Sequence, residues 1–135
     1  MPIQPDAKEK KCETRTSTKN ALILGASGAL GRAIAQELLS RGYGLGLHYN
    51  TQRSVCESLA SEASLRGLSA ACYQADFSDP QAPARVAGEF IKQFPRLDAL
   101  ICSAGIVRDG ALANITEEDI CHTLNVNLRS IFLVL

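Results

Sequence analysis

The segment ALILGASGALGR, residues 21–32, decides the fold of this chain. Its first four residues are apolar, which is typical of a buried strand, and glycines follow at positions 25, 28 and 31. Residues 32–40 then carry apolar side chains at helical spacing, and Gly42 is placed to end that helix. A strand, a glycine-rich turn and a helix in this order predict the first unit of a parallel α/β sheet.

The same alternation continues along the chain. We predict further strands over 43–49, 69–74 and 97–102, and further helices over 54–65, from the Asp79-Pro80 pair to Phe94, and from Thr116 onward. Val86, Phe90, Ile91 and Phe94 form the apolar stripe expected of the third helix. Strands that alternate with helices imply right-handed βαβ units and a parallel sheet covered on both faces. We expect this α/β domain to occupy residues 20–135, after a polar, disordered leader over residues 1–19.

Composition excludes several classes of protein. The 135 residues carry no net formal charge, and 46% are hydrophobic against 21% charged, so the chain has no general electrostatic reason to bind nucleic acid. No apolar run is long enough to cross a bilayer, and no secretory signal begins the chain. The five cysteines are widely and irregularly spaced, which predicts no zinc or other metal site and favours a reducing cytoplasm.

The glycine loop, residues 25–31, suits the binding of a nucleotide pyrophosphate. A pyrophosphate needs a tight turn, close approach of the backbone, and the free N–H groups of a helix N-terminus. Gly25, Gly28 and Gly31 meet these needs, and Ser27 adds a hydroxyl donor. The glycine pattern is also compatible with a tight turn that binds no ligand.

Four motifs resemble, in order, those of the short-chain dehydrogenase/reductase family. They are GASGALGRAIA at 25–35, DFSD at 76–79, LDALICSAG at 97–105 and NVNL at 125–128. The segment IVRD at 106–109 is similar to the branch that contains 3-oxoacyl-[acyl-carrier-protein] reductases of fatty acid biosynthesis. The resemblance implies a Rossmann-type doubly wound parallel sheet, here truncated after the fourth strand and the following helix. Leu24 and the Cys102-Ser103 pair depart from the family's usual Thr and Asn-Asn. The glycine spacing resembles that of the family's extended branch, so an extended-type epimerase or an atypical reductase is an alternative interpretation.

By this resemblance, each motif has a role in holding a nicotinamide dinucleotide. The glycine loop would bind the pyrophosphate, while Asp76 would accept a hydrogen bond from adenine with Phe77 beside the ring. Asn127 would be the catalytic-site residue that holds a water in a proton relay. The cofactor-binding set is Gly25, Ser27, Gly28, Leu30, Gly31, Asn50, Arg53, Asp76, Phe77, Ser103, Ala104 and Gly105. His48 and His122 are interpreted as packing or surface residues.

The end of the second strand favours NADP(H) over NAD(H). NAD-binding proteins usually place a carboxylate there for the ribose 2′-hydroxyl, whereas residues 48–53 (HYNTQR) carry no acid. A 2′-phosphate would meet no repulsion, and Arg53 could pair with it. A solvated Arg53 at the start of a helix is the alternative.

The family's proton donor has no counterpart in this sequence. A tyrosine donates the proton, and a lysine four residues later lowers the tyrosine's pKa. None of Tyr43, Tyr49 and Tyr73 is followed by such a lysine. We therefore expect the cofactor half of an NADP(H)-dependent oxidoreductase, whose complete form acts on a carbonyl such as a 3-oxoacyl thioester and forms homo-oligomers. A non-catalytic nucleotide-binding or interaction module is the alternative.

Overall fold

The computed structural model describes residues 18–135, so the expected leader lies outside the described residues except for its last two positions. The elements, in chain order, are β1 (Asn20–Leu24), α1 (Ala29–Ser40), β2 (Gly44–Tyr49), α2 (Arg53–Leu65), β3 (Ala70–Gln74), α3 (Ala82–Gln93), β4 (Ala99–Cys102), the 3₁₀ turn η1 (Leu112–Asn114), α4 (Glu117–Leu124), the π-helical segment η2 (Asn125–Arg129) and α5 (Ser130–Val134). The alternation of strands and helices that the sequence predicts is confirmed.

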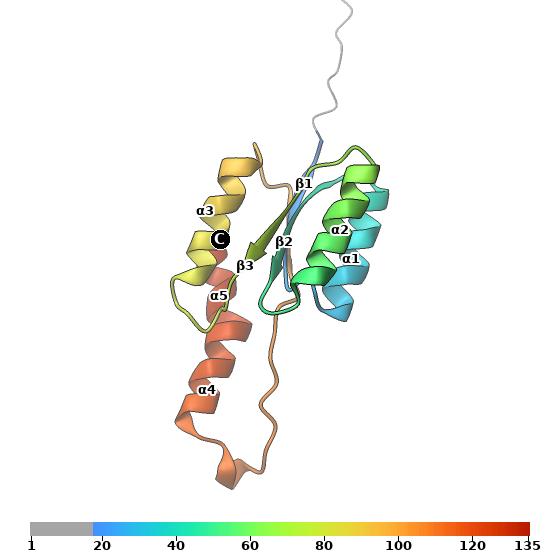
Figure 1. Ribbon diagram of the computed structural model, residues 1–135. Coiled ribbons are helices and arrows are strands. Elements are labelled where there is room, and N and C mark those ends of the chain that lie inside the picture. The colour runs from blue at the N-terminus through green and yellow to red at the C-terminus, as the bar shows by residue number, and fades with distance from the viewer. Residues whose placement is uncertain (1–17) are drawn as a thin grey trace, which may run out of the picture.

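The four strands form one parallel sheet in the order β3-β2-β1-β4. Ala21 of β1 lies opposite Leu45 of β2 on one side and opposite Ala99 of β4 on the other. Helices α1 and α2 cover one face of the sheet, and α3 and α5 cover the other (Figure 1). The doubly wound parallel sheet is therefore confirmed.

Strand β1 is buried along its whole length because both faces of the sheet are covered. Ala21 and Ile23 belong to the core under α1 and α2, whereas Leu22 and Leu24 belong to the core under α3 and α5. Successive side chains of a strand point to opposite faces, so a central strand must be apolar at every position. The continuous apolar run in the sequence has this physical origin.

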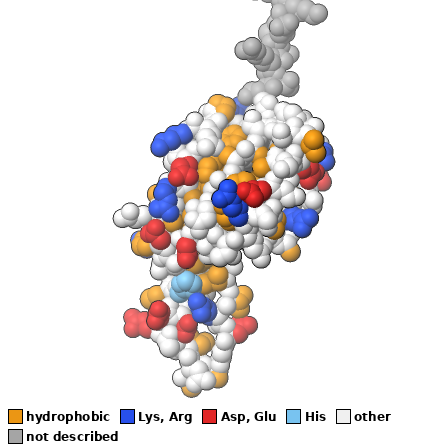
Figure 2. Space-filling view, in the orientation of Figure 1, with side chains coloured by type: hydrophobic (Ala, Val, Ile, Leu, Met, Phe, Trp, Pro, Cys, Tyr) orange, Lys and Arg blue, Asp and Glu red, His pale blue; other side chains and the backbone are white. Residues whose placement is uncertain are grey.

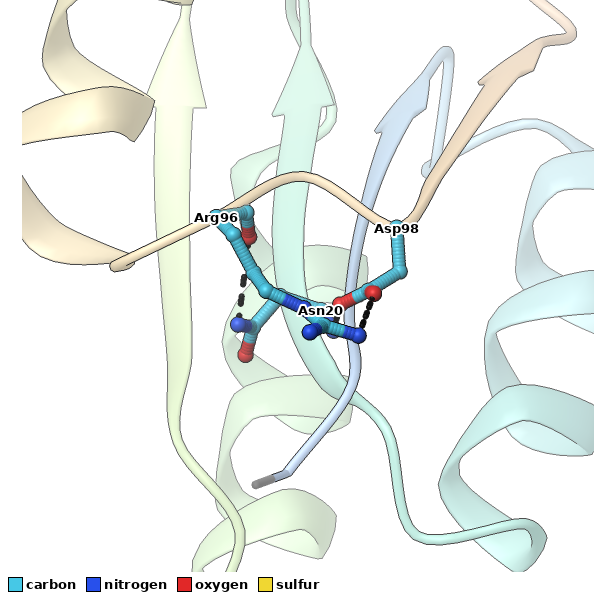
Figure 3. Close-up of polar contacts among 3 residues, drawn as sticks. All are labelled: Asn20, Arg96 and Asp98. Carbon is cyan, nitrogen blue, oxygen red and sulfur yellow. Dashed lines mark hydrogen bonds and ion pairs between the residues drawn. The ribbon is translucent and has the colours of Figure 1, made fainter.

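A polar cluster joins the amino ends of β1 and β4 (Figure 3). The Asn20 N–H donates to Asp98 Oδ2 at 2.8 Å, the Asp98 N–H donates to the Asn20 carbonyl at 2.8 Å, and the Asn20 amide donates to the Arg96 carbonyl. The ion pair with the Arg96 guanidinium and the Asn20 N–H lower the pKa of Asp98 below its ordinary value. The contribution of Asp98 to stability is therefore present above the ordinary carboxyl pKa and is lost as the pH falls through the lowered one.

Two helix starts differ from the prediction. Helix α1 begins at Ala29, inside the expected turn. Helix α3 begins at Ala82 rather than at the Asp79-Pro80 pair, because the Asp79 carboxylate accepts the N–H of Gln81 and so closes a turn ahead of the helix. Ile91 is 71% exposed and does not belong to the buried stripe of α3, which Val86 and Phe90 do form.

The last helical stretch starts as expected and then changes character. Thr116 and Asp119 form a capping box at the start of α4, in which each side chain accepts the other's backbone N–H. The π-helical segment η2 interrupts the stretch before α5. Ile120, Leu124 and Leu128 keep their helical spacing, but about half of each side chain is exposed. None of the helices within residues 18–135 has the length and apolar character of a membrane span.

Candidate functional site

A cavity of about 310 Å³ opens at the carboxyl edge of the sheet. All four strands are parallel, so the loops that follow them meet at this edge, where α/β proteins commonly bind their ligands. The lining residues come from all four of these loops, from the end of β2, and from α4 and η2: Gly25, Ser27, Gly28, His48, Asn50, Thr51, Gln52, Ala75, Asp76, Phe77, Ser103, Ala104, Gly105, Ile106, His122 and Val126. Nine of the twelve expected cofactor-binding residues therefore line one cavity.

Close packing of the glycine loop accounts for two of its glycines. Gly25 has a φ of +80°, and a Cβ there would lie 2.6 Å from the backbone nitrogen of Ala104. A Cβ at Gly31 would lie 2.2 Å from the carbonyl oxygen of Gly25. Both contacts are with backbone, which cannot rotate away. Gly25 therefore lets the turn between β1 and α1 pack against the end of β4, and Gly31 lets the first turn of α1 pack against that turn. Gly31 contributes to the site through this packing and does not line the cavity.

Gly28 leaves the N-terminus of α1 open to the cavity. It is the N-cap residue, with φ −73° and ψ 162°, and no side chain caps the helix. The first turn contains no acidic residue, and its N–H groups have no acceptor within the helix. Leu30 is in this first turn, is 64% exposed and is not among the residues that line the cavity. An uncapped helix end of this kind attracts an anion.

Asp76 and Phe77 follow β3 and form one corner of the cavity. The Ser78 N–H donates to Asp76 Oδ1 at 2.9 Å, and this hydrogen bond lowers the pKa of the Asp76 carboxyl below its ordinary value. Asp76 is thus ionised at neutral pH and presents an acceptor. The Phe77 ring is 4% exposed and is stacked on His48, with 4.0 Å between the ring centroids.

The end of β2 brings only part of its predicted set to the cavity. Asn50 lines the cavity, and its carbonyl accepts the Gln74 side-chain amide at 3.0 Å. Arg53 is not among the lining residues, since its Nε donates to Glu57 Oε1 at 2.6 Å along the exposed face of α2. Thr51 and Gln52 line the cavity in its place. The polar run 50–52 was a signal for them, because it directly follows a buried strand.

The end of β4 supplies a serine and two small residues. The Ser103 hydroxyl donates to the Leu24 carbonyl at 2.7 Å and ties β4 to β1 just before the glycine loop.

Asn127 lies in η2 and does not line the cavity. Its side chain accepts the Ile106 N–H and donates to the Ile106 carbonyl, both at 2.8 Å, and so holds the loop after β4 in place.

Two histidines, interpreted from the sequence as packing or surface residues, line the cavity. His48 is buried, as a packing residue would be, but it lines the cavity and has a hydrogen-bond partner at each ring nitrogen. His122 reaches the cavity from α4.

Within residues 18–135 no three His, Cys, Asp or Glu side chains gather as metal ligands. Basic and acidic side chains are interspersed on the face shown in Figure 2.

Comparison with known proteins identifies relatives for nearly all of the described chain. The family model for short chain dehydrogenases matches residues 19–135. The 3-oxoacyl-[acyl-carrier-protein] reductase FabG of Staphylococcus aureus is 32% identical over 115 residues, which is 85% of this chain and 47% of the relative. The chain thus spans about half the length of the curated relatives it matches.

Solved structures of dehydrogenases and reductases are also similar to this chain. A short-chain dehydrogenase from Burkholderia cenocepacia in complex with NADP has a TM-score of 0.82 and 34% identity over 86% of this chain and 47% of its own. A blue fluorescent protein from a metagenomic library, in complex with NADPH, has a TM-score of 0.83 and 30% identity over 86% and 48%. An NADH-dependent reductase of alginate metabolism has a TM-score of 0.79 and 26% identity over 87% and 48%.

Proposed function

Since this chain belongs to the short-chain dehydrogenase family, we propose that it forms the NADP(H)-binding half of an oxidoreductase. The complete protein would transfer a hydride to or from a carbonyl or alcohol such as a 3-oxoacyl thioester. The uncapped N-terminus of α1 at the carboxyl-edge cavity is the observation that carries the proposal. It presents N–H donors and the positive end of a helix dipole to a space that three further loops close.

The proposed pose follows the chemistry of the lining residues. The pyrophosphate would lie against Ser27, Gly28 and the first N–H groups of α1, including that of Leu30. The adenine amino group would donate to the ionised Asp76, next to the His48–Phe77 stack. The first ribose would face Asn50. The small residues Ala104 and Gly105 would let the second ribose approach the end of β4.

The nicotinamide end of the pose points toward the loop that Asn127 holds. We propose that Asn127 acts there by fixing Ile106, through its two hydrogen bonds, and by holding a water beside the reacting carbonyl. Bound NADPH would supply the hydride. The residues of this chain would orient the dinucleotide and keep its pyrophosphate and adenine in place.

Binding of NADPH by the purified full chain tests the proposal. We expect saturable binding, and tighter binding of NADPH than of NADH, since residues 50–52 offer amide and hydroxyl groups without a carboxylate. Asn50→Asp is the matched variant, because it changes charge and hardly any volume. It should weaken NADPH about tenfold and leave NADH nearly unchanged. Failure of both dinucleotides to bind at millimolar concentration would refute the proposal for this chain.

Measuring NADPH oxidation tests whether this chain is only the cofactor-binding half or a complete enzyme. None of the three tyrosines has a lysine four residues later. This chain therefore has no Tyr-Lys pair to protonate the carbonyl oxygen. We expect this chain to bind NADPH without oxidising it in the presence of an acetoacetyl thioester, as a non-catalytic nucleotide-binding module also would. NADPH oxidation is monitored by the loss of NADPH absorbance. Clear oxidation that depends on the thioester would contradict the inference that this chain lacks the proton donor.

A further inference from the structure

His48 connects two loops of the cavity through its side chain. The residue is in β2, one position before its end, and is 3% exposed. The Gly25 N–H donates to Nδ1 at 3.1 Å, and Nε2 lies 3.0 Å from the Ala75 carbonyl oxygen. Because Nδ1 accepts a hydrogen bond, the ring proton is on Nε2, which donates to Ala75. Only the neutral imidazole satisfies both partners.

Two more contacts extend this connection. The Ala26 N–H donates to the His48 carbonyl at 2.8 Å, so the glycine loop is attached to both the backbone and the side chain of this residue. The imidazole is also stacked on Phe77, with an interplanar angle of 1°. One residue of β2 thus positions the glycine loop, the end of β3 and the aromatic corner of the cavity.

We infer that His48 is a positioning residue that keeps the cavity in its binding geometry only while its imidazole is neutral, so that affinity for a nicotinamide dinucleotide falls in acid. The inference rests on the proposed function. Protonation would place an N–H donor at Nδ1 against the Gly25 N–H donor, at a distance of 3.1 Å between the nitrogens. The two donors repel, and the new charge stands beside the positive N-terminus of α1. The glycine loop must then move away from the position in which α1 faces the cavity.

The surroundings of the ring place this transition below neutral pH. Burial lowers the pKa of His48 below its ordinary value, against a smaller opposing effect of the Ala75 carbonyl. The residues of the glycine loop, 25–31, carry no ionisable side chain. The ionisable groups that line the same cavity from other elements are Asp76, after β3, and His122, on α4. Both are kept in the variants below, so their titration is common to every comparison.

The test compares dinucleotide affinity at two pH values in matched variants of the full chain. NADP⁺ and NAD⁺ are the probes, because both tolerate acid and NAD⁺ lacks a titrating 2′-phosphate. Dissociation constants are measured by calorimetry at pH 8 and pH 5.5, with circular dichroism confirming that each variant is folded. For the wild-type chain we expect both constants to rise severalfold at pH 5.5. One unit of pKa difference between free and bound protein sets a limit of about tenfold, which is reached only when the pH lies well below both pKa values.

Substitutions at position 48 isolate the imidazole. In His48→Asn the side-chain oxygen can still accept the Gly25 N–H but cannot be protonated, so affinity should stay near the wild-type value at pH 8 and change little at pH 5.5. His48→Leu removes the acceptor and should bind weakly at both pH values. Equal pH dependence in the wild type and His48→Asn, or tighter wild-type binding of NAD⁺ in acid, would overturn the inference. No binding by the wild type at pH 8 would instead refute the proposed function.

Nitrogen-15 NMR of the wild-type chain keeps the test decisive even if the variants do not fold. We expect the signals of His48 to report the neutral Nε2–H tautomer at pH 7 and to titrate below the ordinary imidazole range. Addition of NAD⁺ should move that titration to still lower pH. An Nδ1–H tautomer, or a titration that NAD⁺ moves to higher pH, would overturn the inference.

Discussion

Alanine in place of Gly31 is expected to reduce the free energy of unfolding by about 2–3 kcal/mol, because the new methyl group has no room. It would lie 2.2 Å from the Gly25 carbonyl oxygen and 2.9 Å from the Ala26 Cα, both of which are backbone atoms. Relief requires the first turn of α1 to move away from the backbone of Gly25 and Ala26. Chemical denaturation followed by circular dichroism measures the change.

Gly88 provides the matched control for this substitution. It is within α3, and a Cβ there meets nothing within 4 Å. Gly88→Ala should therefore stabilise the protein by up to about 1 kcal/mol through helix propensity alone. A wild-type denaturation midpoint for Gly31→Ala would show that the turn adapts freely, and would contradict the close packing that explains this glycine.

Aspartate in place of Gly28 is expected to abolish dinucleotide binding without loss of stability. Gly28 has the extended backbone of an N-cap, and a Cβ there meets only the Gly25 carbonyl oxygen, at 3.4 Å. Aspartate is among the best N-cap residues, and it would occupy the N–H groups that the proposed pyrophosphate needs. Its charge also repels that pyrophosphate. We expect the Kd for NADPH to rise at least about 100-fold, since both effects act on the same charged contact.

Gly28→Asn separates the two effects, because asparagine caps the helix equally well without a charge. It should weaken NADPH binding less than aspartate does, while both variants keep or exceed the wild-type melting temperature. Titration with NADPH and thermal denaturation provide the two measurements. Wild-type affinity in Gly28→Asp would place the pyrophosphate elsewhere, and would remove the observation on which the proposed function depends.

Sequence patterns were most informative where neighbouring residues decide the structure. The alternation of apolar strands and amphipathic helices predicted the parallel sheet, because a central strand such as β1 must be apolar on both faces. The glycine loop was also predicted from neighbouring residues, because Gly25 and Gly31 have no room for a Cβ in this tight turn. Asp76 was expected at the cofactor site from the resemblance of residues 76–79 to a family motif, and it lines the cavity.

Local patterns were misleading where a side chain has two possible partners. Asp79 before a proline is typical of a helix start, but its carboxylate closes the preceding turn instead. Arg53 could pair with a 2′-phosphate or be a solvated residue at the start of a helix, and in the structure its Nε donates to Glu57 one helical turn away. Both outcomes depend on which of several polar groups a flexible side chain contacts, and spacing alone does not rank those contacts.

The sequence by itself determined the order of the strands along the chain and the glycine-rich turn between β1 and α1. Only the tertiary structure decided that His48 and His122 line the cavity and that Asn127 holds the loop after β4. The physical reason is distance along the chain. Gly25 and His48 are 23 residues apart, and Ile106 and Asn127 are 21 apart, so these contacts exist only once β1, β2 and β4 lie side by side.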